Sequence, residues 1–200
     1  MRGEATDVSL GVATFEDESG DHIAIAVEGE TFFETVYSLI TPQGPQRLTL
    51  PRKSTIHEFF ADRLIVTLEE AWTVGGQTYP SGGLLALPLA SATRAAPTIE
   101  VIFAPNDRQS IEDVEATRDG LLVAGFDNVR GRLQRFTLRS GSWRGEQLAL
   151  PPTGVVTLPG MSTSESRAFA VFEDFLTPPT LYALNGAQAR SVRSLPAQFD

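Results

Sequence analysis

Residues 121–151 read LLVAGFDNVRGRLQRFTLRSGSWRGEQLALP, and this stretch decides the fold. An apolar segment at 121–124 leads through a polar turn into a second apolar segment at 133–138. A third segment, 147–151, closes the unit and ends in a Leu-Pro pair. Short apolar segments separated by turn residues predict antiparallel strands joined as hairpins. Proline cannot donate to a β-ladder, so the Leu-Pro pair is expected at a strand end or outer edge.

The same order of segments occurs four times along the chain. First strands begin at Ile23, Leu64, Leu121 and Phe169, at intervals of 41, 57 and 48 residues. Second strands are expected at 35–39, 83–87, 133–138 and 180–184, and third strands at 47–51, 99–105, 147–151 and 192–196. Further inner strands are expected at 111–117 and 155–158, and an inner strand or a short turn at 54–60. This spacing is typical of propeller blades.

The composition of the strands separates a propeller from a β-sandwich. A sandwich strand has one wet face and alternates between apolar and polar residues. Here the first two strands of each unit are apolar at almost every position, as expected where neighbouring blades cover both faces. We therefore predict an all-β fold, a β-propeller fragment of about four blades of three- to four-stranded antiparallel sheets. The approximate blades are 7–51, 52–105, 106–151 and 152–200, in one partial domain that spans 1–200 without a hydrolase domain.

Composition and charge exclude several classes of function. The 200 residues carry 16 basic and 25 acidic side chains, a formal net charge of -9, and no cysteine. Without a basic footprint, nucleic-acid binding is not expected. The arginines are scattered among apolar strand residues and are interpreted as a solvated strand rim: Arg118, Arg130, Arg132, Arg135, Arg139 and Arg144. A disulfide scaffold and a thiolate metal site are excluded. No apolar run reaches the length of a membrane helix, and a cytoplasmic location is favoured.

No catalytic, cofactor-binding or metal-binding residue is predicted in this chain. A serine hydrolase needs a nucleophile elbow, and the closest match to Gly-x-Ser-x-Gly, residues 160–164, fails at its last position. His22 and His57 are interpreted as structural because no nucleophile is placed to use them. The acidic run at 16–21 lacks the ligand spacing of a calcium loop and is interpreted as a solvated hairpin turn. No glycine-rich phosphate loop precedes a helix.

Aromatic side chains occur in pairs and clusters. The pairs at 32–33 and 59–60, and the cluster of Phe169, Phe172 and Phe175, predict packing between blades. Trp72 and Phe175 are the expected exceptions, because both fall in loops and could face a partner domain or a channel mouth.

Several longer segments resemble one family. Residues 165–182, ESRAFAVFEDFLTPPTLY, resemble the last propeller blade of prolyl oligopeptidase family serine peptidases, with Asp174 where that family often has serine. Other segments are similar to a bacterial branch of the family: 68–72, 103–110, 117–119, 127–133 and 195–200. The resemblance runs in order along nearly the whole chain, from about residue 7 to residue 200.

The resemblance implies that this chain is the C-terminal part of a propeller, the later blades of a seven-bladed ring. In such enzymes the propeller covers an α/β-hydrolase domain of the same chain, which carries the Ser-Asp-His triad. Access past the propeller restricts cleavage to short peptides, generally after proline. None of the family's catalytic residues matches a position here, so the fragment is expected to be inert alone. Its contacts with the peptide substrate are not placed on this sequence.

Two further expectations follow. Four blades cannot close a seven-bladed ring, so exposed apolar blade faces predict self-association of the fragment, with two four-blade halves completing one ring. The alternative function is a stand-alone small β-propeller that binds a peptide, a sugar or a protein partner in its channel. No cofactor, nucleic acid or membrane is expected as a partner under either hypothesis.

Overall fold

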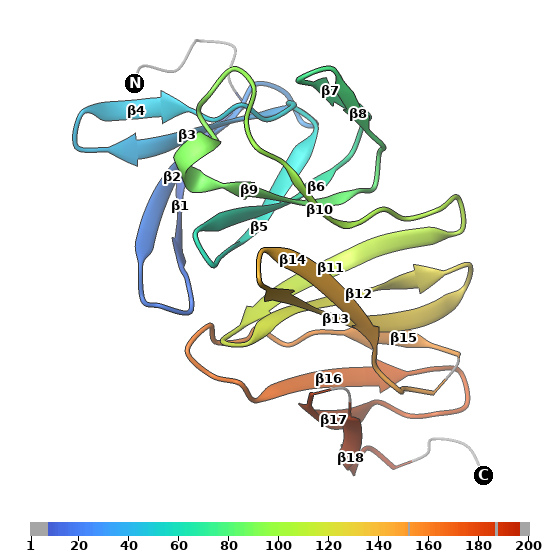
Figure 1. Cartoon of the computed structure of the whole chain (residues 1–200). Coiled ribbons are helices and arrows are strands. Elements are labelled where there is room, and N and C mark those ends of the chain that lie inside the picture. Colours follow the sequence, from blue (N-terminus) through green and yellow to red (C-terminus); the bar gives the residue numbers. More distant parts are fainter. Residues whose placement is uncertain (1–7, 152, 187, 197–200) are drawn as a thin grey trace. The chain divides into compact units, whose positions relative to one another are not determined.

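A computed structural model of the chain describes residues 8–151, 153–186 and 188–196 (Figure 1). The chain divides into two compact units, residues 1–104 and 105–200. Within the described residues the helical content is the short 3₁₀ turn Leu89–Ser91, and none of their helices is long and apolar enough to cross a membrane. The prediction of an all-β chain is confirmed.

Unit 1 contains two four-stranded antiparallel sheets among its described residues. The first sheet is formed in chain order by β1 (Ser9–Glu16), β2 (His22–Gly29), β3 (Thr35–Thr41) and β4 (Gly44–Arg47). The second is formed by β5 (Ser54–Phe60), β6 (Arg63–Leu68), β9 (Leu84–Pro88) and β10 (Glu100–Phe103). A separate hairpin of β7 (Trp72–Val74) and β8 (Gln77–Tyr79) is inserted between β6 and β9.

Unit 2 repeats this arrangement without the inserted hairpin. One sheet is formed by β11 (Gln109–Thr117), β12 (Gly120–Asp127), β13 (Arg130–Arg139) and β14 (Ser142–Gln147). The other is formed by β15 (Val155–Thr157), β16 (Ala168–Glu173), β17 (Thr180–Asn185) and β18 (Gln188–Ser194). Each sheet is an up-and-down meander in which successive strands pair, as in a propeller blade.

Burial follows the order of the strands in each sheet. The second strands β6 and β12 are buried at most of their positions, whereas the fourth strands β14 and β18 are exposed along nearly their whole length. The prediction of an apolar middle and a wetter last strand is therefore confirmed. The core of unit 1 includes Phe59 and Leu64, and that of unit 2 includes Phe172 and Leu133.

The Leu-Pro pairs lie elsewhere than expected in the first and third sheets. The last strands of these sheets, β4 and β14, end before the Leu-Pro pairs. The last strands predicted from the sequence, at 47–51 and 147–151, are therefore wrong in position. The pairs themselves, Leu50-Pro51 and Leu150-Pro151, lie in the connection after the strand, and Leu48 and Leu148 just before them are buried anchors. Each donates its backbone N–H to the preceding third strand, Leu48 to the carbonyl of Tyr37 and Leu148 to that of Leu133, both at 2.9 Å. The strands β4 and β14 were missed because they are polar and turn-like in sequence.

One inner strand was also missing from the sequence prediction. The inner strands expected near 54–60, 111–117 and 155–158 are present as β5, β11 and β15. No counterpart was predicted for the first sheet, where β1 pairs with β2 over eight residues. Small and polar residues interrupt the apolar residues of β1, such as Leu10 and Val12, so its sequence lacks the continuous apolar run that marks the second strands.

Candidate interaction face

The two ends of each sheet carry different connections. In a four-stranded antiparallel meander, the start of the first strand, the loop between the second and third strands, and the end of the fourth strand share one end. We call this the entry end, and the other, where the remaining two turns lie, the hairpin end. A chain that enters and leaves such a sheet does both at its entry end.

The most exposed large apolar side chains of the described residues lie in entry-end loops. Those more than three-quarters exposed are Phe32 (88%), Phe33 (78%), Val129 (87%), Phe175 (104%) and Leu176 (94%). All of them lie between the second and third strand of a sheet. Side chains of this size are usually turned inward unless another surface covers them. In each unit the entry-end loops therefore form a candidate interaction face of that unit.

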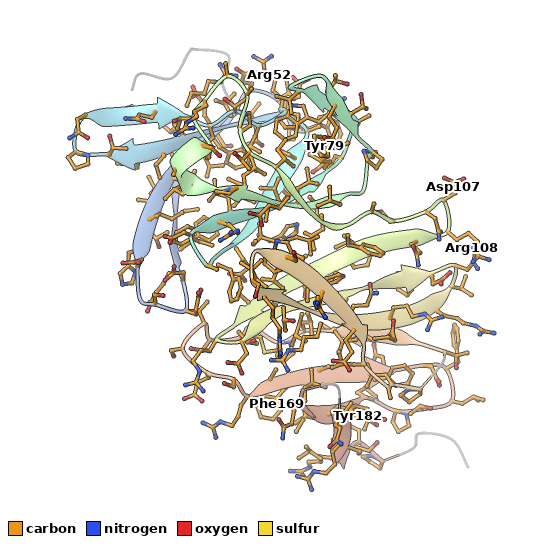
Figure 2. All side chains as sticks on the ribbon, viewed as in Figure 1. Arg52, Tyr79, Asp107, Arg108, Phe169 and Tyr182 are labelled. Carbon is orange, nitrogen blue, oxygen red and sulfur yellow. The ribbon has the colours of Figure 1, made fainter. Side chains whose placement is uncertain are left out.

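In unit 1 the loop between β2 and β3 is held by Arg52. Its Nε lies 2.5 Å from Oε2 of Glu30, and its Nη2 donates to Oε1 at 3.1 Å. The carbonyl of Arg52 accepts the N–H of Thr35 at 2.9 Å. Because Arg52, labelled in Figure 2, follows β4, these contacts join two connections at one end of the sheet. Phe32 and Phe33 extend from a loop whose base is fixed.

In unit 2 Asp174 builds the loop that presents Phe175 and Leu176. Its Oδ1 accepts the backbone N–H groups of Leu176 at 2.8 Å and Thr177 at 2.6 Å, and its own N–H donates to the carbonyl of Thr177 at 3.0 Å. Such side-chain-to-backbone bonds define an Asx turn. The backbone donors of Leu176 and Thr177 lower the pKa of Asp174 below its ordinary value. The family resemblance flagged this position, and the structure gives the aspartate a role in the turn.

Two glycines bring the entry-end loops of unit 2 together. The N–H of Gly131 on β13 donates to the carbonyl of Gly154 at 2.9 Å. Gly154 has a φ of +132°, and a Cβ there would lie 2.4 Å from the carbonyl oxygen of Glu173. Glycine is required because no other residue allows both the positive φ and this approach. The connection that leaves β14 is thereby held against β13 and β16.

These loops enclose a groove of about 640 Å³ at the entry end of unit 2. Its walls are mainly apolar and include Phe126, Val129, Val155, Phe175 and Leu176, with Asp174 at the rim. A concave apolar surface with few polar groups suits an apolar segment of another domain or peptide. Arg108, labelled in Figure 2, precedes β11 at the same end of this sheet, and its carbonyl accepts the N–H of Asn128 at 2.6 Å.

The hairpin end is polar by comparison. The turn after β1 holds Asp17, whose Oδ1 accepts the N–H groups of Ser19 at 2.9 Å and Asp21 at 3.0 Å. The predicted hairpin turn is present, but Asp17 is buried, so the expectation of a fully solvated turn is wrong for this residue. Carboxylate oxygens of Asp17, Asp21 and Asp62 lie within 4.8 Å of one another. The hydrogen bonds that Asp17 accepts account for its burial as a turn residue.

The aromatic predictions have mixed outcomes. Phe59 and Phe60 are buried as expected, whereas the prediction of packing is wrong for Phe32 and Phe33, which lie in an exposed loop. Trp72 is not in a loop: it lies on β7, is 9% exposed and packs against Tyr79 with ring centroids 6.1 Å apart. No signal within the sequence separates an exposed Phe-Phe pair from a buried one.

The two histidines take part in local contacts. Nδ1 of His22 lies 3.8 Å from a carboxylate oxygen of Glu16, and both side chains are exposed. Nε2 of His57 lies 2.8 Å from the hydroxyl oxygen of Thr67 on the neighbouring strand. The interpretation of both histidines as structural stays a prediction.

Comparisons with known proteins identify the fold. The model of the prolyl oligopeptidase N-terminal β-propeller domain matches residues 10–193. The uncharacterized peptidase y4nA of Sinorhizobium fredii is 27% identical over 210 residues, which cover 100% of this chain and 29% of that protein. The uncharacterized peptidase RP174 of Rickettsia prowazekii is 23% identical over 141 residues, 68% of this chain and 20% of that protein.

Solved structures agree on the fold. A post-proline cleaving enzyme from Rickettsia typhi superimposes with a TM-score of 0.86 at 18% identity, over 98% of this chain and 29% of that one. Oligopeptidase B from Trypanosoma brucei gives a TM-score of 0.70 at 15% identity, over 96% of this chain and 28% of that one. This chain thus spans less than a third of the length of these relatives. It belongs to the prolyl oligopeptidase family and corresponds to part of its N-terminal β-propeller domain.

Proposed function

We propose that these blades are part of the lid of a serine peptidase, covering an α/β-hydrolase domain of the same polypeptide and admitting only short peptides. The relative from Rickettsia typhi is a post-proline cleaving enzyme, which supports cleavage after proline as the reaction of the whole protein. The blades supply no nucleophile or base under this proposal. Their contribution is to exclude large substrates and bulk water from a reaction that takes place in the other domain.

The concentration of exposed apolar side chains at the entry end is the observation that carries the proposal. A domain joined to a meander of this kind is joined at the entry end, since the first strand begins and the fourth strand ends there. Under this proposal Phe32 and Phe33 in unit 1, and Phe175 and Leu176 in unit 2, lie at the end of their own sheet to which such a domain is joined. Covering them stabilises the assembly by the burial of apolar surface.

The groove of unit 2 supplies a second argument. Its walls include Val129, Phe175 and Leu176, and Asp174 holds the last two in an ordered turn. An ordered turn loses less conformational entropy on docking than a flexible loop does. The groove is thus suited to a fixed contact with the hydrolase domain beside the path of the peptide.

The test uses the polypeptide encoded by the full reading frame. Its kcat/KM is measured on fluorogenic peptides of increasing length, each with one proline, for the wild type and for Phe175→Ser/Leu176→Ser. We expect the wild type to discriminate strongly against long peptides and the double variant to lose much of this discrimination. The 200-residue chain alone is expected to give no turnover above the blank.

A matched control uses an exposed apolar residue at the hairpin end. Ile40 on β3 is 43% exposed and precedes the turn into β4, so Ile40→Ser is expected to leave the length dependence unchanged. Equal length dependence in all three proteins would contradict the proposal, and so would turnover by the 200-residue chain.

Self-association of the isolated chain is part of the same proposal. Val8, Leu10 and Val12 alternate along β1 and its approach, and each is more than half exposed. Residues two apart on a strand lie on one face, so these three form an apolar strip that a neighbouring blade covers in a complete propeller. In the isolated chain a second copy covers it instead.

A further inference from the structure

A second groove lies in unit 2, away from the entry-end loops. It has a volume of about 580 Å³, and polar groups make up most of its lining. Arg135, Arg139 and Arg144 contribute to its wall, together with Asp119 and Glu146. Three of the six arginines interpreted above as a solvated rim therefore line one groove.

The strand register explains why these side chains share a face. On β13, Arg135, Thr137 and Arg139 are two residues apart, so their side chains point to the same side of the sheet. On β14, Glu146 pairs with Arg135 and Arg144 pairs with Thr137. Directly paired residues in an antiparallel ladder also lie on one face. The neighbouring strands β13 and β14 (Figure 1) thus carry three guanidinium groups on a single surface.

The charges on this surface are only partly compensated. Nη2 of Arg135 lies 3.7 Å from Oδ2 of Asp119, and the Arg135 side chain is 17% exposed. Asp119 is shared with Arg118, whose Nε lies 3.8 Å from its Oδ1. Among the described residues, no carboxylate lies within ion-pair distance of Arg139 or Arg144. Arg139 and Arg144 occupy diagonal positions of one ladder, where long side chains reach one another, so a single anion can contact both.

We propose that this groove binds a small oxyanion, a carboxylate or phosphate group, between Arg139 and Arg144. The guanidinium fork matches the paired oxygens of both groups, and Thr137, opposite Arg144, adds a hydroxyl group on the same face. Three guanidinium groups against two carboxylates leave one net positive charge. That suffices for one anionic group, whereas an extended polyanion such as a nucleic acid requires many such contacts.

The test titrates the 200-residue chain with inorganic phosphate and, separately, with succinate, at constant ionic strength. Binding is followed through the backbone amide resonances of Thr137 and Gly145, which lie on the groove. We compare the wild type with Arg139→Gln/Arg144→Gln and with the control Arg190→Gln. Arg190 is an exposed residue on β18 of the same unit and does not line the groove.

The wild type and Arg190→Gln are expected to saturate with the same affinity for at least one probe. The double variant is expected to bind more weakly by about tenfold or more, since hydrogen bonds to a charged group are lost. Saturation by phosphate alone identifies a phosphate site, and saturation by succinate alone identifies a carboxylate site. Shifts that do not saturate with either probe, or an equal affinity in the double variant, would overturn the proposal.

Discussion

The carboxylate of Asp174 accepts the backbone N–H of Leu176 at 2.8 Å, and the side chain of Leu176 is 94% exposed. The hydrogen bond fixes the backbone at the point where an apolar side chain is turned into solvent. An Asx turn stabilises a loop through its own backbone, and here it does so without burying the side chain of Leu176. The relationship fits a loop that is ordered in advance for contact with another surface.

The Asp174 turn is expected to depend on pH. The pKa of this carboxyl is lowered in the folded chain by the N–H donors of Leu176 and Thr177. The contribution of the ionised Asp174 to the stability of the turn is therefore complete above the ordinary pKa of an aspartate. It is lost as the pH falls through the lower pKa of the folded chain. We expect the amide resonances of Leu176 and Thr177 to shift in that acid range. In Asp174→Asn the amide acceptor does not titrate, and a persisting shift would contradict this assignment.

Two phenylalanines three residues apart are expected to differ sharply in their effect on stability. Phe172 is fully buried and Phe175 is fully exposed. Phe172→Ala should lower the free energy of unfolding by about 3–5 kcal/mol, because it leaves a cavity in the core of unit 2. Phe175→Ala should change it by less than about 0.5 kcal/mol. Urea unfolding followed by circular dichroism measures both, and similar midpoints would contradict the placement of these rings.

Gly154 is expected to tolerate no side chain. Its φ of +132° disfavours any other residue, and a Cβ would meet the carbonyl oxygen of Glu173 and the ring of Phe172. Gly154→Ala should therefore cost about 1–3 kcal/mol. Gly160 has open space around its Cβ position, so Gly160→Ala serves as the control and should change stability by less than about 0.5 kcal/mol. The two variants are compared by thermal unfolding, and an unchanged Tm for Gly154→Ala would contradict the close approach.

Self-association is expected to depend on the apolar strip of β1. Leu10→Lys/Val12→Lys places two charges on that strip and should shift the chain toward the monomer in multi-angle light scattering at micromolar concentration. Ile40→Lys changes an exposed apolar residue elsewhere in the same unit and should leave the molar mass unchanged. A wild-type chain that is already a monodisperse monomer would count against self-association.

The sequence by itself determined the architecture, because the repeat consists of local patterns of apolar and turn-forming residues. Apolar segments near Ile23, Leu64, Leu121 and Phe169 alternate with turn residues, and each became a strand in the middle of a sheet. Burial on both faces of a strand requires apolar residues at successive positions, so these strands can be predicted from the sequence alone. The predicted blade boundaries, and the assignment of these blades to the later part of the ring, stay predictions.

Only the tertiary structure decided which apolar side chains are exposed and which residues share one face of a sheet. Phe32 and Phe33 read in sequence like Phe59 and Phe60, yet one pair is exposed and the other is buried. The fourth strands β4 and β14 are too polar to be recognised, since their stability comes from pairing with β3 and β13 and not from their own side chains. The approach of Gly131 to Gly154 and the gathering of three arginines on one face depend on register. Register is a property of paired strands, and a single strand read alone does not contain it.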